Sequence, residues 1–447
     1  MKKTVAILAA LAMILAFATT ALAAGGGPPK GVMTGTFTSV DAATGTAQFV
    51  KSGQEAAETL SLAEGVDTAS IPVDKKVMIS LSEGEGSTKV IKDVSIMFIG
   101  LPMGKVIALL IIGLVGGLLS GFIGSGGAFV LTPARMSLGD PGAVAVASNM
   151  AHKFPKAMVG AYKRFKYGQV DLKLGLVMAL SAIVGVQIGI HIQKLILDTW
   201  GNAGSNLYVS VVFVVVLVVV GGYVFRDAIK LNKGGGAEVQ GTKLSRALSR
   251  INLPPMMHFK TAGVTMSAWV TLPIGLFTGM LAATIAVGGF VGVPGMIYII
   301  GASAIVASAS ELVVAFIMGL WGSTQWALSG LVDIRMTLLI LAGSLFGVQL
   351  GALGTTYVKD YTVKIVMGSV MLIVAVSRGA KIPIYLTDLG FMHVEAGLAT
   401  VLNSISFWAL IAALAVAGVI ITSAMIKGIV LDRSSQSRSE ELAPSSK

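Results

Sequence analysis

The sequence has no cysteine among its 447 residues. This absence excludes disulfide bonds, catalytic thiolates, iron–sulfur clusters and zinc held by cysteine. Charged residues are also scarce, at 12% of the chain, whereas a soluble domain carries about a quarter. The histidines, His152, His191, His258 and His393, are too scattered to form a recognisable metal-binding motif. We therefore expect no metal, no cofactor and no large soluble core.

Apolar residues dominate what remains. They make up 54% of the chain, and the mean hydropathy is +0.83. The net charge is +11, but the positive residues fall in short segments between apolar runs, which favours a membrane over nucleic acid as the partner. The sequence predicts a polytopic α-helical membrane protein. The stretches long enough to span a bilayer are 103–122, 141–162, 172–197, 206–225, 264–285, 302–321, 335–356, 362–378 and 399–426.

The N-terminus has the features of a secretory signal. Lys2 and Lys3 precede an apolar run, and residues 21–23 (ALA) supply the small side chains of a cleavage site. We expect residues 1–23 to be removed, with an uncleaved anchor helix as the alternative. In either case the next segment, 24–99, is exported.

Residues 24–99 differ in pattern from the rest of the chain. After a Gly- and Pro-rich linker, short alternating runs at 32–40, 46–50, 58–62, 76–80 and 88–96 are separated by turn residues. Five short strands predict a small β-barrel or sandwich, with the OB fold as one candidate. The surface aromatics and basic groove of a nucleic-acid-binding OB domain are missing. We expect an extracytoplasmic lid, stabiliser or docking module.

The apolar part of the chain repeats itself at an offset of 162 residues. At this offset Gly168-x-Val-Asp171 aligns with Gly330-x-Val-Asp333, and Gly185-Val-Gln-x-Gly189 aligns with Gly347-Val-Gln-x-Gly351. Two such motifs at one common offset predict a tandem duplication. Each copy also contains a short, Gly-rich apolar segment, at 123–139 and 286–301.

Positive charges predict the orientation of the segments. The loop 226–262 carries seven Lys or Arg residues against two acidic ones, which places it in the cytoplasm together with the tail 427–447. These signs and an exported N-terminus agree if 123–139 and 286–301 each cross the membrane. Each repeat then has five crossings. Because five is an odd number, the two repeats have opposite orientations in the membrane. Arg378 and Lys381 are the main exceptions to the charge rule, because this topology places them outside. A re-entrant segment in each repeat is the alternative.

The predicted division of the chain follows from these boundaries. It comprises a signal peptide (1–23), an extracytoplasmic β domain (24–99), a first transmembrane repeat (100–225), a cytoplasmic loop (226–262), a second repeat (263–380), a connecting loop with a last transmembrane helix (381–426) and a cytoplasmic tail (427–447).

The Gly-rich segments are the first candidate for a substrate site. Where a helix breaks inside a bilayer, its free N–H groups and the positive end of its dipole suit an anion. Inverted repeats with such breaks are typical of secondary transporters. Close packing of small residues between helices is the alternative. The residues concerned are Gly124, Ser125, Gly126, Gly127, Gly288 and Gly289.

Polar residues in the helix after each break are the second candidate. Ser148 and His152 share a helix face, and Ser310 matches Ser148 in the second copy. Lys153 and Glu311 fall in the middle of predicted membrane-spanning stretches. An ionisable group there costs at least ~2.5 kcal/mol, so it normally faces a cavity or a partner. A purely structural pair of Lys153 with Glu311 is the alternative. We expect substrate contacts from Ser148, Asn149, Lys153 and Ser310, and ion coupling from His152 and Glu311.

Gln187 and Gln349 occupy the same place in the paired GVQxG motifs. An amide side chain can hydrogen-bond either a substrate or the opposite repeat. The sequence does not choose between the two, so both residues remain substrate-binding candidates.

Several of these stretches together resemble one known family. IGSGGAFVLTP (123–133) and AVASN (145–149), with weaker copies at 285–294 and 307–311, are similar to TauE/SafE-type sulfite exporters, over roughly 104–426. The resemblance implies a duplicated, ion-coupled carrier of sulfur-containing anions such as sulfite and sulfonates. The chain departs from the family in its signal and β domain. It also has Ala286-Val-Gly-Gly where the first copy has Gly124-Ser-Gly-Gly.

Taken together, the sequence predicts a secondary transporter in the bacterial inner membrane. It exports a small anion, sulfite or an organosulfonate, coupled to H⁺ or Na⁺, with its partners being that anion and the bilayer rather than nucleic acid. No nucleophile–base pair is present, so we expect no enzyme. The alternative is a membrane-embedded sensor or partner-docking protein in which the β domain does the recognising. Oligomeric state and coupling ion are left open.

Overall fold

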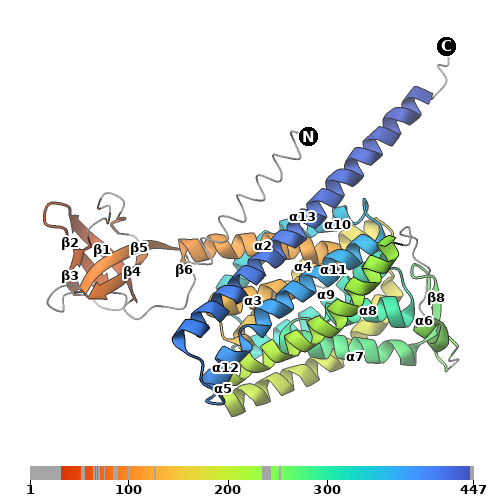
Figure 1. The fold of residues 1–447 in the computed structure, drawn as a ribbon, viewed down its shortest axis with the longest axis horizontal. Coiled ribbons are helices and arrows are strands. Elements are labelled where there is room, and N and C mark those ends of the chain that lie inside the picture. Colours follow the sequence, from red (N-terminus) through yellow and green to blue (C-terminus); the bar gives the residue numbers. More distant parts are fainter. Residues whose placement is uncertain are drawn as a thin grey trace. The chain divides into compact units, whose positions relative to one another are not determined.

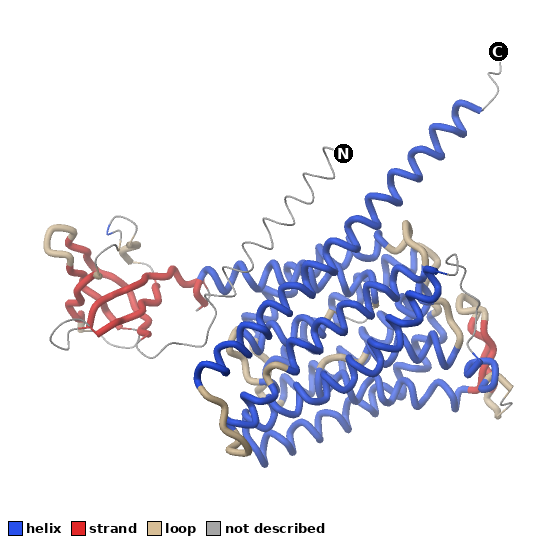
Figure 2. Tube along the Cα trace, in the orientation of Figure 1, coloured by secondary structure: helices blue, strands red, loops and turns tan. Residues whose placement is uncertain are grey.

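The computed structural model describes residues 32–51, 56–63, 66, 68, 71–74, 76–83, 89–98, 101–124, 127–233, 243–250 and 253–442. The predicted signal peptide therefore lies outside the described residues. The chain forms two compact units, one from Phe17 to Leu109 and the other holding the helices from Leu110 onward. Figures 1 and 2 show the strands confined to the first unit and to one small hairpin of the second.

The first unit is a five-stranded β-barrel. Its strands pair in the order β3-β2-β1-β4-β5, and a parallel pairing of β3 with β5 closes the sheet. The five predicted strands are confirmed to within a few residues, and the barrel alternative is the one observed, with the strand pairing of an OB fold. The strands are β1 (Val32–Asp41), β2 (Thr46–Lys51), β3 (Ala57–Leu62), β4 (Lys76–Glu83) and β5 (Lys89–Phe98), followed by β6 (Leu101–Pro102).

Alternation along the strands builds the barrel core. Phe37 and Phe49 are fully buried and contact each other edge to face, with ring centroids 5.2 Å apart. The turn from β1 to β2 is closed by Asp41, whose carboxylate accepts hydrogen bonds from Ala43 N and Thr44 Oγ1. These bonds, that of Thr44 first, lower the pKa of Asp41.

The second unit consists of helices, and seven described helical segments are long and apolar enough to cross a membrane. This confirms the predicted polytopic helical fold. The seven are α2 (Met103–Ile123), α5 (Leu172–Lys233), α7 (Ala268–Ile285), α9 (Ala304–Leu328), α10 (Ile334–Gly354), α11 (Asp360–Gly379) continued by α12 (Ile382–Asp388), and α13 (Ala396–Leu442).

The remaining elements are shorter or more polar. α4 (Gly142–Lys166) is long but carries several charges, so it is not among the seven. The two Gly-rich segments form α3 (Ala128–Ser137) and the continuous pair α8 (Gly289–Pro294) and η3 (Gly295–Ile300), the latter a π-helix. Between α5 and α7 lie α6 (Lys243–Leu248) and the hairpin of β7 (Met256–Phe259) with β8 (Val264–Ser267).

α5 covers two predicted crossings. Its 62 residues would extend about 93 Å as one straight helix, three times the ~30 Å of a bilayer core. Gly201, with φ 61° and ψ −159°, is not helical and separates two helices. The second helix continues through Lys233, into the segment predicted as a loop, because Arg226, Lys230 and Lys233 keep helical spacing.

Glycines bring two pairs of helices into close contact. Gly113 and Gly117 of α2 lie against the backbone of α10 at Ile340 and Ser344. Ser344 Oγ donates a 3.0 Å hydrogen bond to Gly113 O. Since both sets of residues increase along the chain, α2 and α10 run in the same direction. Small residues allow such backbone approach between membrane helices.

The second close pair is α7 with α5. Gly275 and Gly279 of α7 lie against Met178 and Ala182 of α5. At the offset of 162 residues, Gly275 corresponds to Gly113 and Gly279 to Gly117. The first helix of each predicted repeat therefore packs on the other half of the chain. The duplication remains a prediction, and these exchanged contacts agree with it.

The short helix α3 connects opposite ends of α4. Gly124, before α3, lies against Ser308, whose hydroxyl contacts Arg164 in the last turn of α4. Gly142, after α3, donates from its backbone N to Asn206 Oδ1, at the other end of α4. The chain between Gly124 and Gly142 thus returns along the helix bundle, as a third crossing requires.

Candidate functional site

Two helix breaks form the centre of the candidate site. α2 ends at Ile123, and Gly124 (φ 80°) and Gly127 (φ 64°) reverse the chain before α3. A side chain at Gly124 would collide with the carbonyl oxygen of Ser308, so both φ and space require glycine. In the second half, Ala286 takes the same left-handed conformation (φ 63°) after α7. For a residue with Cβ this conformation costs ~1–2 kcal/mol.

The segments that follow the two breaks meet each other. Phe129 of α3 and Phe290 of α8 are in ring contact, with centroids 4.4 Å apart. Asn149 of α4 donates from Nδ2 to Ala128 O at 3.1 Å and to Thr132 Oγ1 at 2.6 Å, which holds α4 against the first turn of α3. Helix N-termini leave their first N–H groups without intrahelical partners. Two such ends therefore converge in the interior of the unit.

Ionisable side chains gather next to these breaks. All five are at most 1% exposed, and they come from three helices: Arg135 of α3, His152, Lys153 and Lys156 of α4, and Glu311 of α9. We call these five residues the buried charge cluster. The carboxylate of Glu311 lies against Gly292 of α8, where a side chain would collide with it. The cluster is thus in contact with the second break as well.

Several polar atoms of the cluster have no hydrogen-bond partner among the described residues. They are Lys153 Nζ, both carboxylate oxygens of Glu311, His152 Nδ1 and Arg135 Nη1. Lys153 and Glu311 attract each other electrostatically. A buried charge without hydrogen bonds is costly, so such atoms mark a place where a ligand or an ion is expected.

Cations outnumber anions in this cluster. Arg135 is paired with Asp140 at 2.7 Å, and Lys156 Nζ lies 3.1 Å from His152 Nε2. Lys153 and Glu311 attract each other, and the five residues of the cluster include three basic side chains and one carboxylate. A predominantly basic interior favours a negatively charged ligand.

Ser148 and Ser310 are buried, and their hydroxyls contact the opposite half of the chain. Ser148 Oγ accepts from the backbone N–H of Asp333, and Ser310 Oγ accepts from that of Asp171, each at 2.9 Å. At the offset of 162 residues Ser148 corresponds to Ser310 and Asp171 corresponds to Asp333, so each serine bonds the aspartate of the other half. Each serine thereby fixes the start of α10 or α5, and only its hydroxyl hydrogen is left for a substrate.

The other predicted site residues fall into three groups. Gly127, Gly288 and Gly289 are buried at the breaks, whereas Ser125 and Gly126 lie outside the described residues. Gln187 and Gln349 are exposed on the outer surface of α5 and α10. Gln349 donates to the backbone oxygen of Leu345 in its own helix. The structure therefore does not bring the two glutamines to the buried charge cluster.

Sequence reasoning missed Lys156 and Arg164. Lys156 lies four residues after His152, so helical spacing could have placed it on the same face. Arg164 lies in the last turn of α4, where a basic residue normally reaches solvent, but it is fully buried. Its guanidinium donates to Ser308 Oγ at 2.8 Å and to Ile305 O at 2.7 Å, with longer bonds to the last carbonyls of α2. Arg164 thus ties the end of α2 to the start of α9.

Comparison with known proteins identifies the helical unit. The family model described as sulfite exporter TauE/SafE matches residues 109–378. The chain is also similar to a protein of Bacillus subtilis (strain 168) named probable membrane transporter protein YunE, with 22% identity over 276 residues, 60% of this chain and 95% of that protein. No solved structure matches the chain. The β-barrel unit lies outside the family match.

Proposed function

The chain belongs to the sulfite exporter TauE/SafE family and is a multi-pass membrane transporter, and we propose that it exports a small anion, sulfite or an organosulfonate, across the inner membrane. The proposal includes secondary transport coupled to H⁺ or Na⁺. The observation that carries it is the buried charge cluster, whose Lys153 ammonium and Glu311 carboxylate have no hydrogen-bond partner among the described residues and lie beside two helix breaks.

The substrate anion is proposed to lie between the two breaks. Lys153 donates from a fully buried ammonium that has no hydrogen-bond partner among the described residues. Backbone N–H groups at the start of α3 add donors that need no charge of their own. Asn149 holds α3 and α4 together at this point. Such a cradle suits an oxyanion, whose several oxygens accept several hydrogen bonds.

His152 and Glu311 are proposed to couple transport to an ion. Both are buried beside Lys153, and both retain unpartnered atoms. When the substrate is absent, Glu311 is the carboxylate that attracts Lys153. A bound anion competes for the same ammonium, so substrate binding and the charge state of Glu311 are linked. Protonation of Glu311, or Na⁺ bound to it, then offsets its charge.

Inverted repeats are proposed as the framework for alternating access. The exchanged contacts of α2 with α10 and of α7 with α5, and the exchanged Ser–Asp bonds, support this arrangement. In such transporters one repeat moves against the other around a fixed central site.

The test is flux into proteoliposomes of the purified full chain. We expect saturable uptake of radiolabelled sulfite, competition by sulfonates and not by simple carboxylates, and a response to an imposed pH or Na⁺ gradient. Saturable flux of another anion would keep the carrier and discard the sulfur assignment. Absence of flux for every tested anion from folded protein would contradict the proposal.

That last result would favour the alternative, a sensor or docking protein that recognises its partner through the β-barrel. The barrel has its own closed core, which gives this alternative a structural basis. Flux through residues 100–447 placed behind a signal peptide separates the two. Retained flux would show that the barrel is not needed for transport.

A further inference from the structure

An apolar groove lies on the surface of the helical unit, and none of its lining residues belongs to the buried charge cluster. It has a volume of about 640 Å³ and is formed by α5, α6, α7, α8 and η3. Its walls are aliphatic and aromatic, including Val219, Phe277 and Val291. Val219 is 66% exposed and Phe277 is 50% exposed, so the groove is open to its surroundings. In a membrane transporter those surroundings include lipid.

The length of the groove matches one leaflet of a bilayer. Its lining residues on α8 and η3 extend from Phe290 to Ile299, nine residue steps or at most roughly 14 Å of helix. Half of a ~30 Å hydrocarbon core is ~15 Å. An acyl chain that follows these lining residues from end to end would therefore reach from the membrane centre to its interface.

One end of the groove is polar. Tyr223 and Tyr298 both line it, and their rings meet edge to face at 4.8 Å. Tyr298 Oη donates to Asp227 Oδ2 at 2.8 Å, and Lys364 Nζ pairs with the same oxygen at 2.9 Å. Tyrosines are enriched where membrane meets water. This end therefore corresponds to the headgroup level, and Lys364 pairs with Asp227 there.

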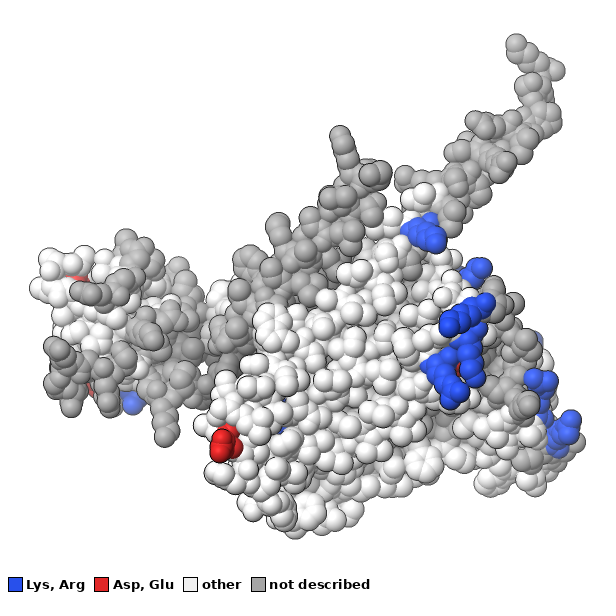
Figure 3. All heavy atoms as spheres, in the orientation of Figure 1, with Lys and Arg blue, Asp and Glu red and all other residues white. Residues whose placement is uncertain are grey.

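Cations continue directly beyond the polar end. Val219 and Tyr223 of α5 share one helix face with Arg226, Lys230 and Lys233, because the spacings of three and four residues repeat. These three cations are exposed. Figure 3 shows Lys and Arg side chains gathered over the end of the helical unit where α5 ends, while the rest of that face carries few charges.

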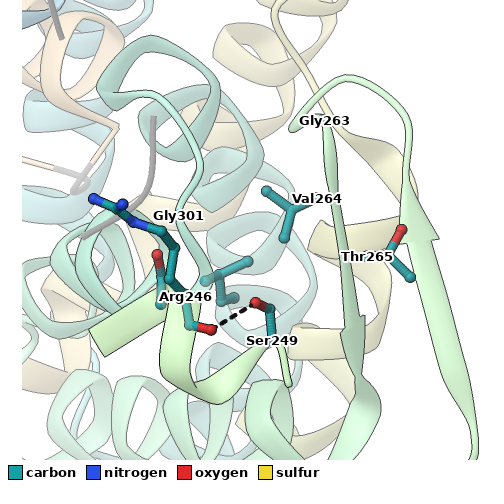
Figure 4. Close-up of a pocket in the computed structure, with 8 residues that line it drawn as sticks. Arg246, Ser249, Gly263, Val264, Thr265 and Gly301 are labelled. Atoms are coloured by element: carbon teal, nitrogen blue, oxygen red, sulfur yellow. Dashed lines mark hydrogen bonds between the residues drawn. The ribbon is translucent and has the colours of Figure 1, made fainter. Parts of the chain in front are cut away.

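A second, polar pocket adjoins the groove across α6. Leu244 of α6 lines the groove, whereas the next residues, Ser245 and Arg246, line a pocket of about 280 Å³. Likewise Ile299 lines the groove and Ile300 lines the pocket. Figure 4 shows Arg246, Ser249 and Thr265 around this pocket, with Ser249 Oγ donating to Arg246 O at 3.0 Å. The apolar groove and the second pocket are thus lined by successive residues of α6 and of η3.

We propose that the groove and the adjoining pocket bind an anionic phospholipid of the bilayer. One acyl chain occupies the groove, and the phosphate lies at the polar end, near Lys230 and Arg246. The apolar walls require a hydrocarbon chain, and the unbalanced cations favour a headgroup with a net negative charge. These residues belong to the segment whose charges predict the cytoplasmic side. The groove shares α8 with the second helix break, but none of the residues altered in the tests below belongs to the buried charge cluster, so lipid binding is measured separately from anion transport.

Native mass spectrometry of the full chain tests the proposal. We expect phosphatidylglycerol to be retained in preference to phosphatidylcholine of the same chain length. The double variant Lys230→Gln with Arg246→Gln should lose roughly thirtyfold in phosphatidylglycerol affinity, since each cation near an anionic lipid contributes about fivefold. The matched control, Lys359→Gln with Lys427→Gln, removes two exposed cations away from the groove and should retain the lipid.

The acyl-chain part is tested by filling the groove. Val219→Trp places an indole in it, and Val215→Trp is the control, one turn earlier on α5 and also exposed but not lining the groove. Only Val219→Trp should displace the lipid. Equal retention of the two lipids by the unaltered chain, or equal effects of the two tryptophans, would overturn the proposal. So would competition by glycerol phosphate, which has the headgroup chemistry and no chain.

Discussion

The two helix breaks share a geometry and differ in chemistry. Gly124 and Ala286 correspond at the offset of 162 residues, and both adopt the left-handed conformation. After the first break, α4 buries His152, Lys153 and Lys156. The corresponding residues of α9 are Val314, Ala315 and Met318, all fully buried.

The single ionisable residue that α9 adds at this level is Glu311, which corresponds to Asn149. One half of the chain therefore supplies the buried cations and the other supplies the carboxylate. The difference teaches that a common backbone frame holds two unlike half-sites. A symmetric cradle of matching side chains is not what this chain builds.

Lys153→Met should reduce anion flux by roughly a hundredfold, because a buried charged donor to a charged ligand contributes about 2–5 kcal/mol. The methionine keeps most of the side-chain volume, so the protein should still insert and purify. Initial rates of flux in proteoliposomes measure the effect. Lys194→Met, which removes an exposed lysine of α5, is the control. Unchanged flux in Lys153→Met would remove this residue from the site.

Gly124→Ala and Ala286→Gly should change stability in opposite directions. The first substitution combines a positive φ with a collision against Ser308 O, and we expect a loss of more than ~2 kcal/mol. The second relieves the left-handed alanine and should gain about 1 kcal/mol. Thermal unfolding in detergent measures both. A destabilised Ala286→Gly would argue against strain at the second break.

Ser148→Ala and Ser310→Ala should each cost about 1–3 kcal/mol, since each leaves a backbone N–H, of Asp333 or Asp171, without its acceptor. Similar losses would support equivalent roles in the two halves. Denaturation midpoints give the comparison, with Ser369→Ala as a control, because the Ser369 hydroxyl donates to carbonyl oxygens of its own helix, those of Ile365 and Val366. A loss for one serine alone would show that the exchanged bonds are not equivalent.

Gln187→Leu and Gln349→Leu should have the smallest effect. Both side chains are exposed on the outer surface, so we expect stability within about 0.5 kcal/mol and unchanged flux. The same flux assay and thermal unfolding apply. A loss of flux at unchanged stability would show that these two glutamines contact the substrate, and that the substrate passes along the outer surface of α5 and α10.

Much of the architecture could be predicted because it follows from local pattern. Alternation predicted β1 to β5 within a few residues, and apolar length predicted the spanning helices. Gly124 and Gly127 were predicted to break the chain, since glycine tolerates positive φ. Ala286 was recognised as a departure from that pattern, yet its backbone adopts the same conformation. The frame therefore tolerates a residue that local preference disfavours.

The composition of the site was less predictable. Ser148, Asn149, His152, Lys153 and Glu311 were placed in the interior correctly by their positions in apolar helices. Gln187 and Gln349 have equally suggestive motifs, but they lie on the opposite side of their helices from the packed glycines. Lys156 could have been found from its helical spacing to His152. Arg164 is near a helix end in sequence, and only its contacts with Ser308 and Ile305 of α9 show why it is buried.

By itself, the sequence determined the elements of this protein: a module of short β-strands, long apolar helices and two glycine-rich interruptions. Spacing and apolar length act within a few residues of each other, so they are readable along the chain. Only the tertiary structure decided which half of the chain satisfies which polar atom. The bonds from Asp333 to Ser148 and from Asp171 to Ser310 join residues more than a hundred positions apart. Such partners depend on how the helices pack, and the local sequence pattern around each residue does not predict them.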